Sequence, residues 1–387
     1  MMKIVFLGAG ASHAAGYPLT SALLPELEKM TASTPNIFVP DYWKRFSEFR
    51  NKTTGVIKRI MFSTNPEVIL SLIDLYTECY KNEEQESWKE FERLLKQSKF
   101  EAVNSEEIPD DSYDTEEKEF NKDKKVFFDA KLAIRDFLKC VDYFFLLRHC
   151  FDSTEKGTKR LQYLKSELSS LSKGDIVITT NWDTLAERVL SDNSRWTPRD
   201  GYGFQVQLKY VDSNGKPLSL TSDVTRTISE SSDVKVLKLH GSYGWLQKEG
   251  NSELYLKSAN YLQYLPIKNS KQNIYVVDSG APSYDQDDVN PVMIYPSFFK
   301  QLKWPQLQSI WYQASKAMNE ADEVHVIGYS LPESDTALLT LLNTIKFRLE
   351  ENTIKKVTID DPDSETRERW KNFLGEKITL RNRRLGN

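Results

Sequence analysis

The chain has few cysteines, no long hydrophobic run and no excess of basic residues, and each absence excludes a class of protein. Its three cysteines, Cys79, Cys140 and Cys150, are odd in number and include no C-x-x-C pair. This usage argues against a disulfide scaffold and against a structural zinc site, and it favours a reducing compartment. We therefore expect a cytoplasmic protein that holds no metal.

Membrane insertion and export are not expected either. No apolar run approaches the roughly 18–20 residues that a membrane-spanning helix requires. The sequence opens directly on an apolar strand pattern, without the basic and then apolar segments of a leader. The formal net charge of −4 gives no general reason to expect direct nucleic-acid binding. The 387 residues suffice for one large domain with insertions, or for two domains.

The pattern of apolar residues divides the chain into an α/β part and a helical block. Short β-branched runs alternate with helical patterns at 1–35 and 173–387, which predicts a Rossmann-like, doubly wound parallel sheet. Amphipathic helical patterns fill 36–172, so we expect a large helical subdomain inserted into the α/β domain. Loop insertions are expected near 195–233 and 248–290. The helical block could be a substrate lid, an oligomer surface or plain helical packing.

Polar or glycine-rich segments follow four of the predicted strands. In chain order they are Gly8-Ala9-Gly10-Ala11-Ser12, Thr180-Asn181-Trp182-Asp183, His240-Gly241-Ser242 and Gly328-Tyr329-Ser330. Right-handed crossovers place the carboxyl ends of parallel strands on one rim, where open α/β sheets bind ligands. We therefore expect these segments to converge around one cavity sized for a dinucleotide.

The first of these segments has the form of a phosphate-binding turn. A strand, a glycine loop and a helix offer backbone N–H groups and a helix N-terminus to a pyrophosphate. Gly8 and Gly10 would permit the tight turn and a close approach of the backbone. His13 stands where the pattern G-x-G-x-x-G requires its third glycine, so the pattern is incomplete. A simple turn is the alternative for this loop.

Together, these motifs resemble the sirtuin-like family, and in particular its prokaryotic branch associated with defence against phage. Residues 8–12 with Gly16-Tyr17-Pro18 resemble the family's Gly-Ala-Gly-x-Ser…Gly-x-Pro loop, and residues 180–183 resemble its Thr/Gln-Asn-x-Asp. Leu239-His240-Gly241 is similar to its Leu-His-Gly, and residues 328–331 to its Gly-Thr/Tyr-Ser-Leu loop. The helical block lies outside the resemblance.

Two departures from the protein deacylases of this family bear on the expected activity. Those enzymes usually hold a zinc ribbon with two C-x-x-C pairs, and this chain has none. The Phe-Arg that usually follows their Gly-x-Pro is Leu19-Thr20 here. The resemblance therefore implies an NAD+ glycohydrolase that cleaves NAD+ to ADP-ribose and nicotinamide. A non-catalytic sensor or regulatory subunit that binds NAD or ADP-ribose, and a zinc-free deacylase, are the alternatives.

The chemistry of nicotinamide loss gives each candidate residue a task. Cleavage passes through an oxocarbenium-like state, so the pyrophosphate must be anchored, the ribose held and a base or nucleophile positioned. Asn181 suits the ribose hydroxyls and a water, and His240 is the candidate general base. Asp183 could orient Asn181, stabilise the cation or simply cap the next helix. The candidate NAD-binding residues are Gly8, Ala9, Gly10, Ala11, Ser12, Thr180, Gly241, Ser242, Gly328, Tyr329, Ser330 and Asp360, the last for the adenosine ribose.

The remaining histidines and the tryptophans beside the motifs are expected to have structural roles. His13 would lie on a helix face beside the pocket, and His149 and His325 occupy packing positions. Trp182 and Trp245 flank motif residues and are expected in the core rather than stacked on a ligand.

Resemblance to the defence branch also implies control of the activity. A free NAD hydrolase would be toxic, so the enzyme is expected to be latent until assembly or a phage signal. The chain ends soon after its last predicted strand, so the trigger is expected in another polypeptide, such as a hexameric DNA-translocating ATPase encoded beside it. The aromatic-rich helices would supply a homo-oligomer surface.

Overall fold

The structure is a computed structural model of the 387-residue chain. It describes residues 1–33, 39–52, 66, 69–71, 73, 132–145, 147–148, 161–206, 209–211, 231–248, 254–256, 275–277, 289–295, 304–332 and 335–383. The chain forms two compact units, one of Met1–Leu19, Phe145–Ile294 and Leu302–Asn387, and one of Thr20–Phe144 and Tyr295–Gln301. Much of the predicted helical block, His149 included, and parts of both predicted loop insertions lie outside the described residues.

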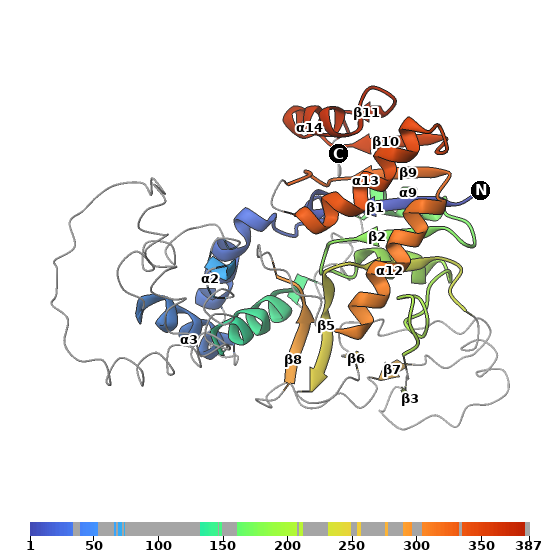
Figure 1. Ribbon diagram of the computed structural model, residues 1–387. Helices are drawn as coiled ribbons and strands as arrows, with labels where there is room; N and C mark the ends of the chain where they lie inside the picture. The colour runs from blue at the N-terminus through green and yellow to red at the C-terminus, as the bar shows by residue number, and fades with distance from the viewer. Residues whose placement is uncertain are drawn as a thin grey trace, which may run out of the picture. The chain divides into compact units, whose positions relative to one another are not determined.

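A six-stranded parallel sheet forms the centre of the first unit (Figure 1). Its strands follow the order β11-β10-β9-β1-β2-β4, and every neighbouring pair is parallel. This is the strand order of a doubly wound dinucleotide-binding sheet. The chain adds β2 and β4 on one side of β1 and then β9, β10 and β11 on the other, so the order of the strands reverses between β1 and β9. The predicted Rossmann-like fold is therefore confirmed. The bounds are β1 (Lys3–Leu7), β2 (Ile176–Thr179), β4 (Lys235–Lys238), β9 (Glu323–Ile327), β10 (Lys356–Asp360) and β11 (Thr379–Arg381).

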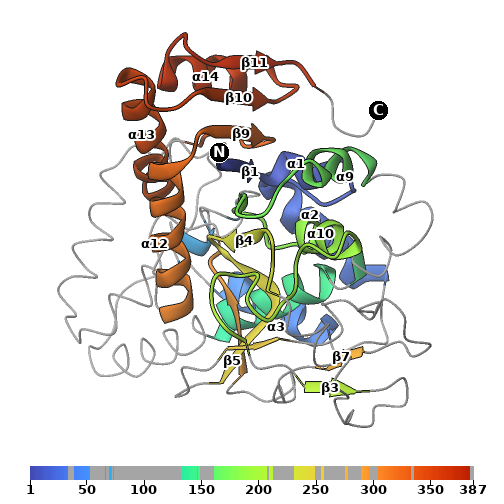
Figure 2. The ribbon, with the colours of Figure 1, turned by 90° about the vertical axis from the view of Figure 1, so that its right-hand side faces the viewer.

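Helices cover both faces of this sheet because its strands are apolar on both sides. Figure 2 shows α12 (Pro305–Glu320) and α13 (Thr336–Glu350) along one face, and α9 (Gln162–Ser169) and α10 (Leu185–Asp192) along the other. The short α1 (Ala9–His13) follows β1, and α14 (Ser364–Leu374) lies between β10 and β11 in the chain. The core between the layers includes the fully buried Val5, Val177, Val236, Val326 and Leu342.

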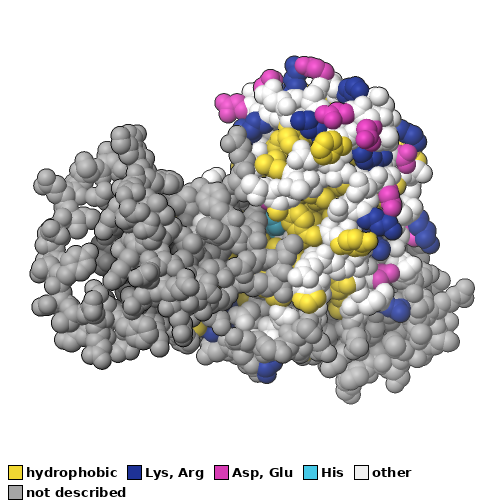
Figure 3. Space-filling view, in the orientation of Figure 1, with side chains coloured by type: hydrophobic (Ala, Val, Ile, Leu, Met, Phe, Trp, Pro, Cys, Tyr) yellow, Lys and Arg dark blue, Asp and Glu magenta, His cyan; other side chains and the backbone are white. Residues whose placement is uncertain are grey.

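Helix starts are set by local chemistry. Pro305 begins α12, where its missing N–H costs nothing. Asp335 caps α13 by accepting from Leu338 N, and Asp363 caps α14 by accepting from the amides of residues 365 and 366. The outer surface over α13 and α14 mixes basic and acidic side chains, as Figure 3 shows.

Two small antiparallel sheets complete the described part of the first unit. β5 (Gly241–Lys248) pairs with β6 (Tyr255–Leu256) and β8 (Val289–Met293), and β3 (Lys209–Val211) pairs with β7 (Tyr275–Val277). β5 begins directly after His240, so the segment after β4 returns at once as a new strand. Gly241 permits this reversal, because its φ is +72° and a Cβ there would meet the carbonyl of Val292.

The second unit is helical in its described residues. It contains η1 (Thr20–Ala22), α2 (Leu23–Ser33), α3 (Val39–Lys52) and a helical segment at 132–144. Arg45 of α3 reaches the buried Asp136 through two hydrogen bonds, Nε to Oδ2 at 2.6 Å and Nη2 to Oδ1 at 3.0 Å. Phe46 packs on Phe137 beside this pair. Among all described helices, none combines the length and apolar character needed to cross a membrane.

Candidate active site

The loops after β9, β1, β2 and β4 are neighbours on one rim of the sheet. These four strands are adjacent and parallel, so their carboxyl ends lie side by side. Gly328 follows β9, Gly8 follows β1, Asn181 follows β2 and His240 follows β4. The rim also includes the reversal of strand order between β1 and β9, where sheets of this kind bind ligands.

Three glycines let the loops after β1 and β9 pack backbone against backbone. Gly8 N donates to Ile327 O at 3.0 Å, and Gly10 N donates to Gly328 O at 2.8 Å. A Cβ on Gly8 would lie 2.5 Å from Gly328 O, and one on Gly328, whose φ is +63°, would collide with Ala11 N. The packing of the two loops thus requires these glycines, whether or not a pyrophosphate binds there.

Three of the predicted phosphate-binding amides are engaged within the protein. Gly8 N donates to Ile327 O, Gly10 N donates to Gly328 O, and Ala11 N donates to Gly8 O at 3.0 Å. Ala9 and Gly10 are half-buried, whereas the side chains of Ala11 and Ser12 are buried. A pyrophosphate at this loop would have to share these donors.

A chain of hydrogen bonds joins the loop after β2 to the loop after β1. Asn181 Nδ2 donates to Gly8 O at 2.8 Å and to Ser12 Oγ at 2.9 Å. Ser12 Oγ in turn donates to Asp183 Oδ2 at 2.6 Å. The other carboxylate oxygen, Asp183 Oδ1, accepts from Leu185 N at 3.0 Å and so caps α10. Asp183 therefore acts on Asn181 through Ser12.

These contacts fix which way the Asn181 amide points. A backbone carbonyl can only accept, so the contact with Gly8 O assigns the amide nitrogen to that side. The Asn181 backbone is held as well, because its N donates to Thr179 Oγ1 at 3.0 Å. Asn181 is half-buried, and its Oδ1 accepts no hydrogen bond from any residue that the structure describes. This oxygen can accept from a hydroxyl group or from water.

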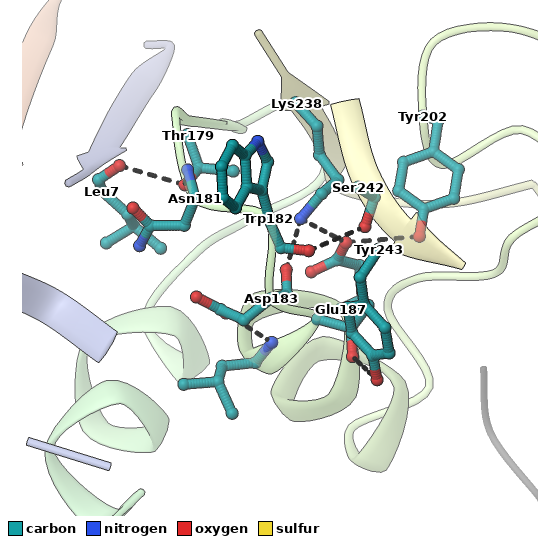
Figure 4. Close-up of polar contacts among 12 residues, drawn as sticks. Leu7, Thr179, Asn181, Trp182, Asp183, Glu187, Tyr202, Lys238, Ser242 and Tyr243 are labelled. Atoms are coloured by element: carbon teal, nitrogen blue, oxygen red, sulfur yellow. Dashed lines mark hydrogen bonds and ion pairs between the residues drawn. The ribbon is translucent and has the colours of Figure 1, made fainter. Parts of the chain in front are cut away.

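A buried ion pair lies beneath this loop (Figure 4). Lys238 Nζ is 3.1 Å from Glu187 Oε1, and the two side chains are 0% and 2% exposed. The ammonium also donates to the backbone carbonyl of Asp183, and Tyr202 OH donates to Glu187 Oε1 at 3.2 Å. Burial raises the pKa of Glu187, and the charge of Lys238 opposes this shift.

We did not predict this pair, although the sequence carries a signal for it. Lys238 ends a strand whose middle residues, Val236 and Leu237, are apolar and buried, and Glu187 is buried in α10 on the side that carries Leu190 and Ser191. Charged side chains are rarely buried unless they are paired. Two such charges in neighbouring elements indicate an ion pair.

His240 lies at the end of β4 beside a carboxylate. Its backbone carbonyl accepts from Ile294 N at 2.8 Å, and its half-buried imidazole Nε2 is 3.7 Å from Asp335 Oδ2. Trp182, next to Asn181, donates from Nε1 to the Ile294 carbonyl at 3.1 Å. The backbone of Ile294 thereby connects the segments that carry Asn181 and His240. The sequence did not identify Asp335 as the neighbour of His240.

Several predicted binding residues are packed inside the protein. Ser242 is fully buried and donates to the carbonyl of Trp182 at 3.1 Å. The buried ring of Tyr329 packs against Phe6 and Trp370, with centroid distances of 5.2 and 6.3 Å. Trp245, as expected, belongs to the core. Their side chains stabilise the rim rather than line an open surface.

The other predicted residues at the rim lie nearer the surface. Thr180 is half-buried, and its N donates to Leu7 O at 3.3 Å. Ser330 is exposed, and its carbonyl accepts from Arg369 Nε at 3.0 Å. His13 is exposed, and its Nδ1 is 3.0 Å from the carbonyl of Tyr17.

Asp360, predicted to meet the adenosine ribose, is buried among charged and polar side chains. Its Oδ2 is 3.0 Å from His325 Nε2 and accepts from Tyr163 OH at 3.1 Å and Arg383 Nη1 at 3.5 Å. Burial favours the neutral acid, but the bond from His325 and the other donors outweigh it, so the pKa of Asp360 is lowered. His325 is buried, and its Nδ1 is 3.4 Å from Glu167. In this arrangement the Asp360 carboxylate is engaged by the protein itself.

A sequence model of the SIR2-like domain matches residues 175–375, just over half of the chain. The protein belongs to this SIR2-like family. Among solved structures, the chain is similar to a mutant Sir2 homologue in complex with 2′-O-acetyl ADP-ribose, with 12% identity, a TM-score of 0.38 and coverage of 100% of this chain and 87% of that one. It is also similar to a Sir2 protein bound to a propionylated peptide, with 13% identity, a TM-score of 0.32 and coverage of 100% and 89%. No curated protein matches.

The predicted sirtuin-like family is thereby confirmed, whereas its anti-phage branch stays a prediction. The SIR2-like match includes Asn181, Lys238, His240 and Gly328, but not the glycine loop after β1. The hydrogen bonds from Asn181 to Gly8 and Ser12 connect that loop to the matched part. Within the described residues, no group of three or more His, Cys, Asp or Glu side chains is placed to hold a metal ion.

Proposed function

We propose that this SIR2-like protein is an NAD+ glycohydrolase, which cleaves NAD+ to ADP-ribose and nicotinamide. The observation that carries the proposal is the fixed Asn181 amide on the rim. Its nitrogen is committed to Gly8 O and Ser12 Oγ, which leaves Oδ1 to accept from a ribose hydroxyl or a water. Membership of the SIR2-like family supports NAD+ as the substrate.

The reaction needs one water and releases one proton. The bond between the ribose and nicotinamide breaks, neutral nicotinamide leaves, and positive charge develops on the ribose. Water adds to the anomeric carbon while His240, as general base, accepts its proton and later passes it to solvent. Asp335, 3.7 Å from His240 Nε2, would stabilise the imidazolium that forms.

The geometry favours two of the three roles considered for Asp183. Both of its carboxylate oxygens are engaged, one by Leu185 N and the other by Ser12 Oγ, and the side chain is 5% exposed. We therefore propose that Asp183 orients Asn181 through Ser12 and caps α10, and that it does not contact the sugar. Residues 8–12 remain the proposed pyrophosphate site.

The proposed biological setting rests on the resemblance of the motifs to the defence branch. In that setting, the protein depletes NAD+ in the cytoplasm during anti-phage defence. The toxicity of an unregulated NAD hydrolase supports latency until assembly or triggering. We propose a separately encoded partner, such as a hexameric DNA-translocating ATPase, and a homo-oligomer surface on the inserted helical subdomain at 36–172.

The test is an assay of nicotinamide release by the purified protein, alone and with its partner. Wild type should release nicotinamide, and Asn181→Ala and His240→Ala should release it at least about 10²-fold more slowly. The control is Asn193→Ala, which changes an exposed asparagine at the end of α10, the helix that follows Asn181. This variant should behave as wild type. NAD+ loss that persists in both site variants would refute the mechanism. Saturable ADP-ribose binding with intact NAD+ under all conditions would instead indicate a sensor.

A further inference from the structure

A buried lysine holds the loop that carries Asn181. Lys238 is fully buried at the end of β4, and its ammonium donates to the Asp183 carbonyl while it pairs with Glu187 (Figure 4). Burying an ammonium costs free energy even when it is paired, and an apolar side chain of similar volume often packs as well. The position of this charge beneath the loop therefore needs a reason other than packing.

We propose that Lys238 is a positioning residue for the reaction, which sets the orientation of Asn181 through the loop at 181–184. This inference rests on the proposed cleavage of NAD+. The connection runs through three hydrogen bonds. Lys238 Nζ holds the Asp183 carbonyl, the Asp183 carboxylate accepts from Ser12 Oγ, and Ser12 Oγ accepts from Asn181 Nδ2.

The loop is anchored from β5 as well as from β4. The carbonyl of Trp182 accepts from Ser242 Oγ at 3.1 Å and from Tyr243 N at 3.0 Å. Two consecutive carbonyls, those of Trp182 and Asp183, are thus bound by the strands below. Only the second is held by a charged group, and Asp183 is the residue that reaches Asn181 through Ser12.

Glu187 makes the buried ammonium possible. It lies in the first turn of α10, whose start is capped by Asp183, and Tyr202 OH donates to the same oxygen that faces Lys238. The ion pair therefore joins β4, the Asn181 loop and α10 at one point. A neutral side chain such as Met could fill the same volume, but it could not donate to the Asp183 carbonyl.

The test compares two variants that differ only in the lysine. Glu187→Gln removes the carboxylate and keeps the amine on the Asp183 carbonyl. The double variant Lys238→Met/Glu187→Gln removes both charges together, so it leaves no unpaired buried charge. We expect the double variant to unfold at the same midpoint as Glu187→Gln or at a higher one, because the single variant leaves the buried ammonium without its carboxylate. The kcat of the double variant should be at least about 10-fold below that of Glu187→Gln, because small misplacements of catalytic groups have large effects.

A double-mutant cycle with Asn181→Ala separates positioning from general stability. If Lys238 acts through Asn181, adding Lys238→Met to the Glu187→Gln/Asn181→Ala variant should cost little further kcat, because coupled residues are not additive. The matched control is Arg348→Met. Arg348 donates to the carbonyls of Met318 and Ala321, near the amino end of β9 and away from the rim. Its loss should lower the unfolding midpoint and leave kcat unchanged.

Crystal structures give a readout that does not depend on activity. In the double variant, Asn181 Nδ2 should lose its contacts with Gly8 O and Ser12 Oγ. If the wild type does not cleave NAD+ but the loop is displaced in the double variant, the proposed function is refuted. The positioning of Asn181 by Lys238 would still stand. A folded double variant with unchanged loop and kcat would overturn the inference. So would a double variant that does not fold, because the lysine would then be required for folding itself.

Discussion

The two halves of the rim use their polar residues differently. On the side of β1, β2 and β4, Asn181 is held by two acceptors, and its Oδ1 accepts no bond from the described residues. On the side of β9 and β10, the carboxylate of Asp360 is buried and engaged by His325, Tyr163 and Arg383. A spare acceptor at a half-buried position can bind a ligand, whereas an engaged carboxylate stabilises the fold. We therefore place the proposed chemistry on the first half.

The two halves meet where the glycines pack. Gly8 and Gly10 of the first half contact Gly328 of the second, and Gly10 N donates to Gly328 O. The half that we propose to bind NAD+ and the half that supports the fold are therefore joined by backbone contacts that tolerate no side chain. A change on the supporting side can reach the binding side through this contact.

His240→Ala should have the largest effect on the first half. A general base typically contributes about 10²–10⁴-fold, so kcat for nicotinamide release should fall by that factor. His13→Ala, which removes an exposed imidazole, is the control and should leave kcat unchanged. Equal losses in both variants would remove His240 from its proposed role.

Gly328→Ala tests the junction between the halves. Alanine is strained at a φ of +63°, and its methyl group would also collide with the backbone of Gly10 and Ala11. We therefore expect a loss of about 2–5 kcal/mol in the free energy of unfolding. Gly375→Ala is the matched control, because Gly375 has φ of +83° but open space around its Cβ position. Its ψ of −167° places Gly375 in a region that is almost exclusive to glycine, so the substitution should cost about 1–3 kcal/mol. Equal losses in denaturant unfolding would show that the close contact adds nothing.

Asp360→Asn tests whether the second half is structural. The pKa of Asp360 is lowered in the folded protein, so its ionised form stabilises the fold above the unfolded-state pKa of about 3.9. Each unit between the two pKa values corresponds to about 1.4 kcal/mol. The wild type should exceed the variant most in unfolding free energy near neutral pH, and this difference should shrink as the pH falls below about 4. A difference that is independent of pH would contradict this assignment.

Ser330→Ala should have the smallest effect. The side chain is exposed, and the hydrogen bond from Arg369 is accepted by the Ser330 carbonyl, which the substitution retains. Unfolding free energy should change by no more than about 0.5 kcal/mol. A large rise in KM for NAD+ would show that the hydroxyl binds the substrate and that the second half takes part in recognition.

The sequence was informative about strands and their ends. Apolar runs such as residues 3–7 and 323–327 form the predicted parallel sheet, because a strand covered on both faces must be apolar throughout. Parallel strands share one rim, so the order of the motifs sufficed to place Gly8, Asn181 and His240 on neighbouring loops. These features depend on local pattern and on general rules of topology.

The direction of individual side chains could not be predicted in the same way. Asp360 ends a strand, but it lies two residues after Thr358, which is the register partner of His325, and its carboxylate contacts that histidine on a face of the sheet. The proximity of His240 to Asp335 depends on a tertiary contact between distant segments that a single sequence does not specify.

A crystal structure with ADP-ribose tests most directly whether Asn181 Oδ1 accepts a hydrogen bond from the substrate, as we propose. We expect a ribose hydroxyl, or a water bound to the ribose, about 3 Å from Asn181 Oδ1, with the amide nitrogen still on Gly8 O and Ser12 Oγ. ADP-ribose bound away from the loops after β1 and β2, with Asn181 untouched, would contradict it.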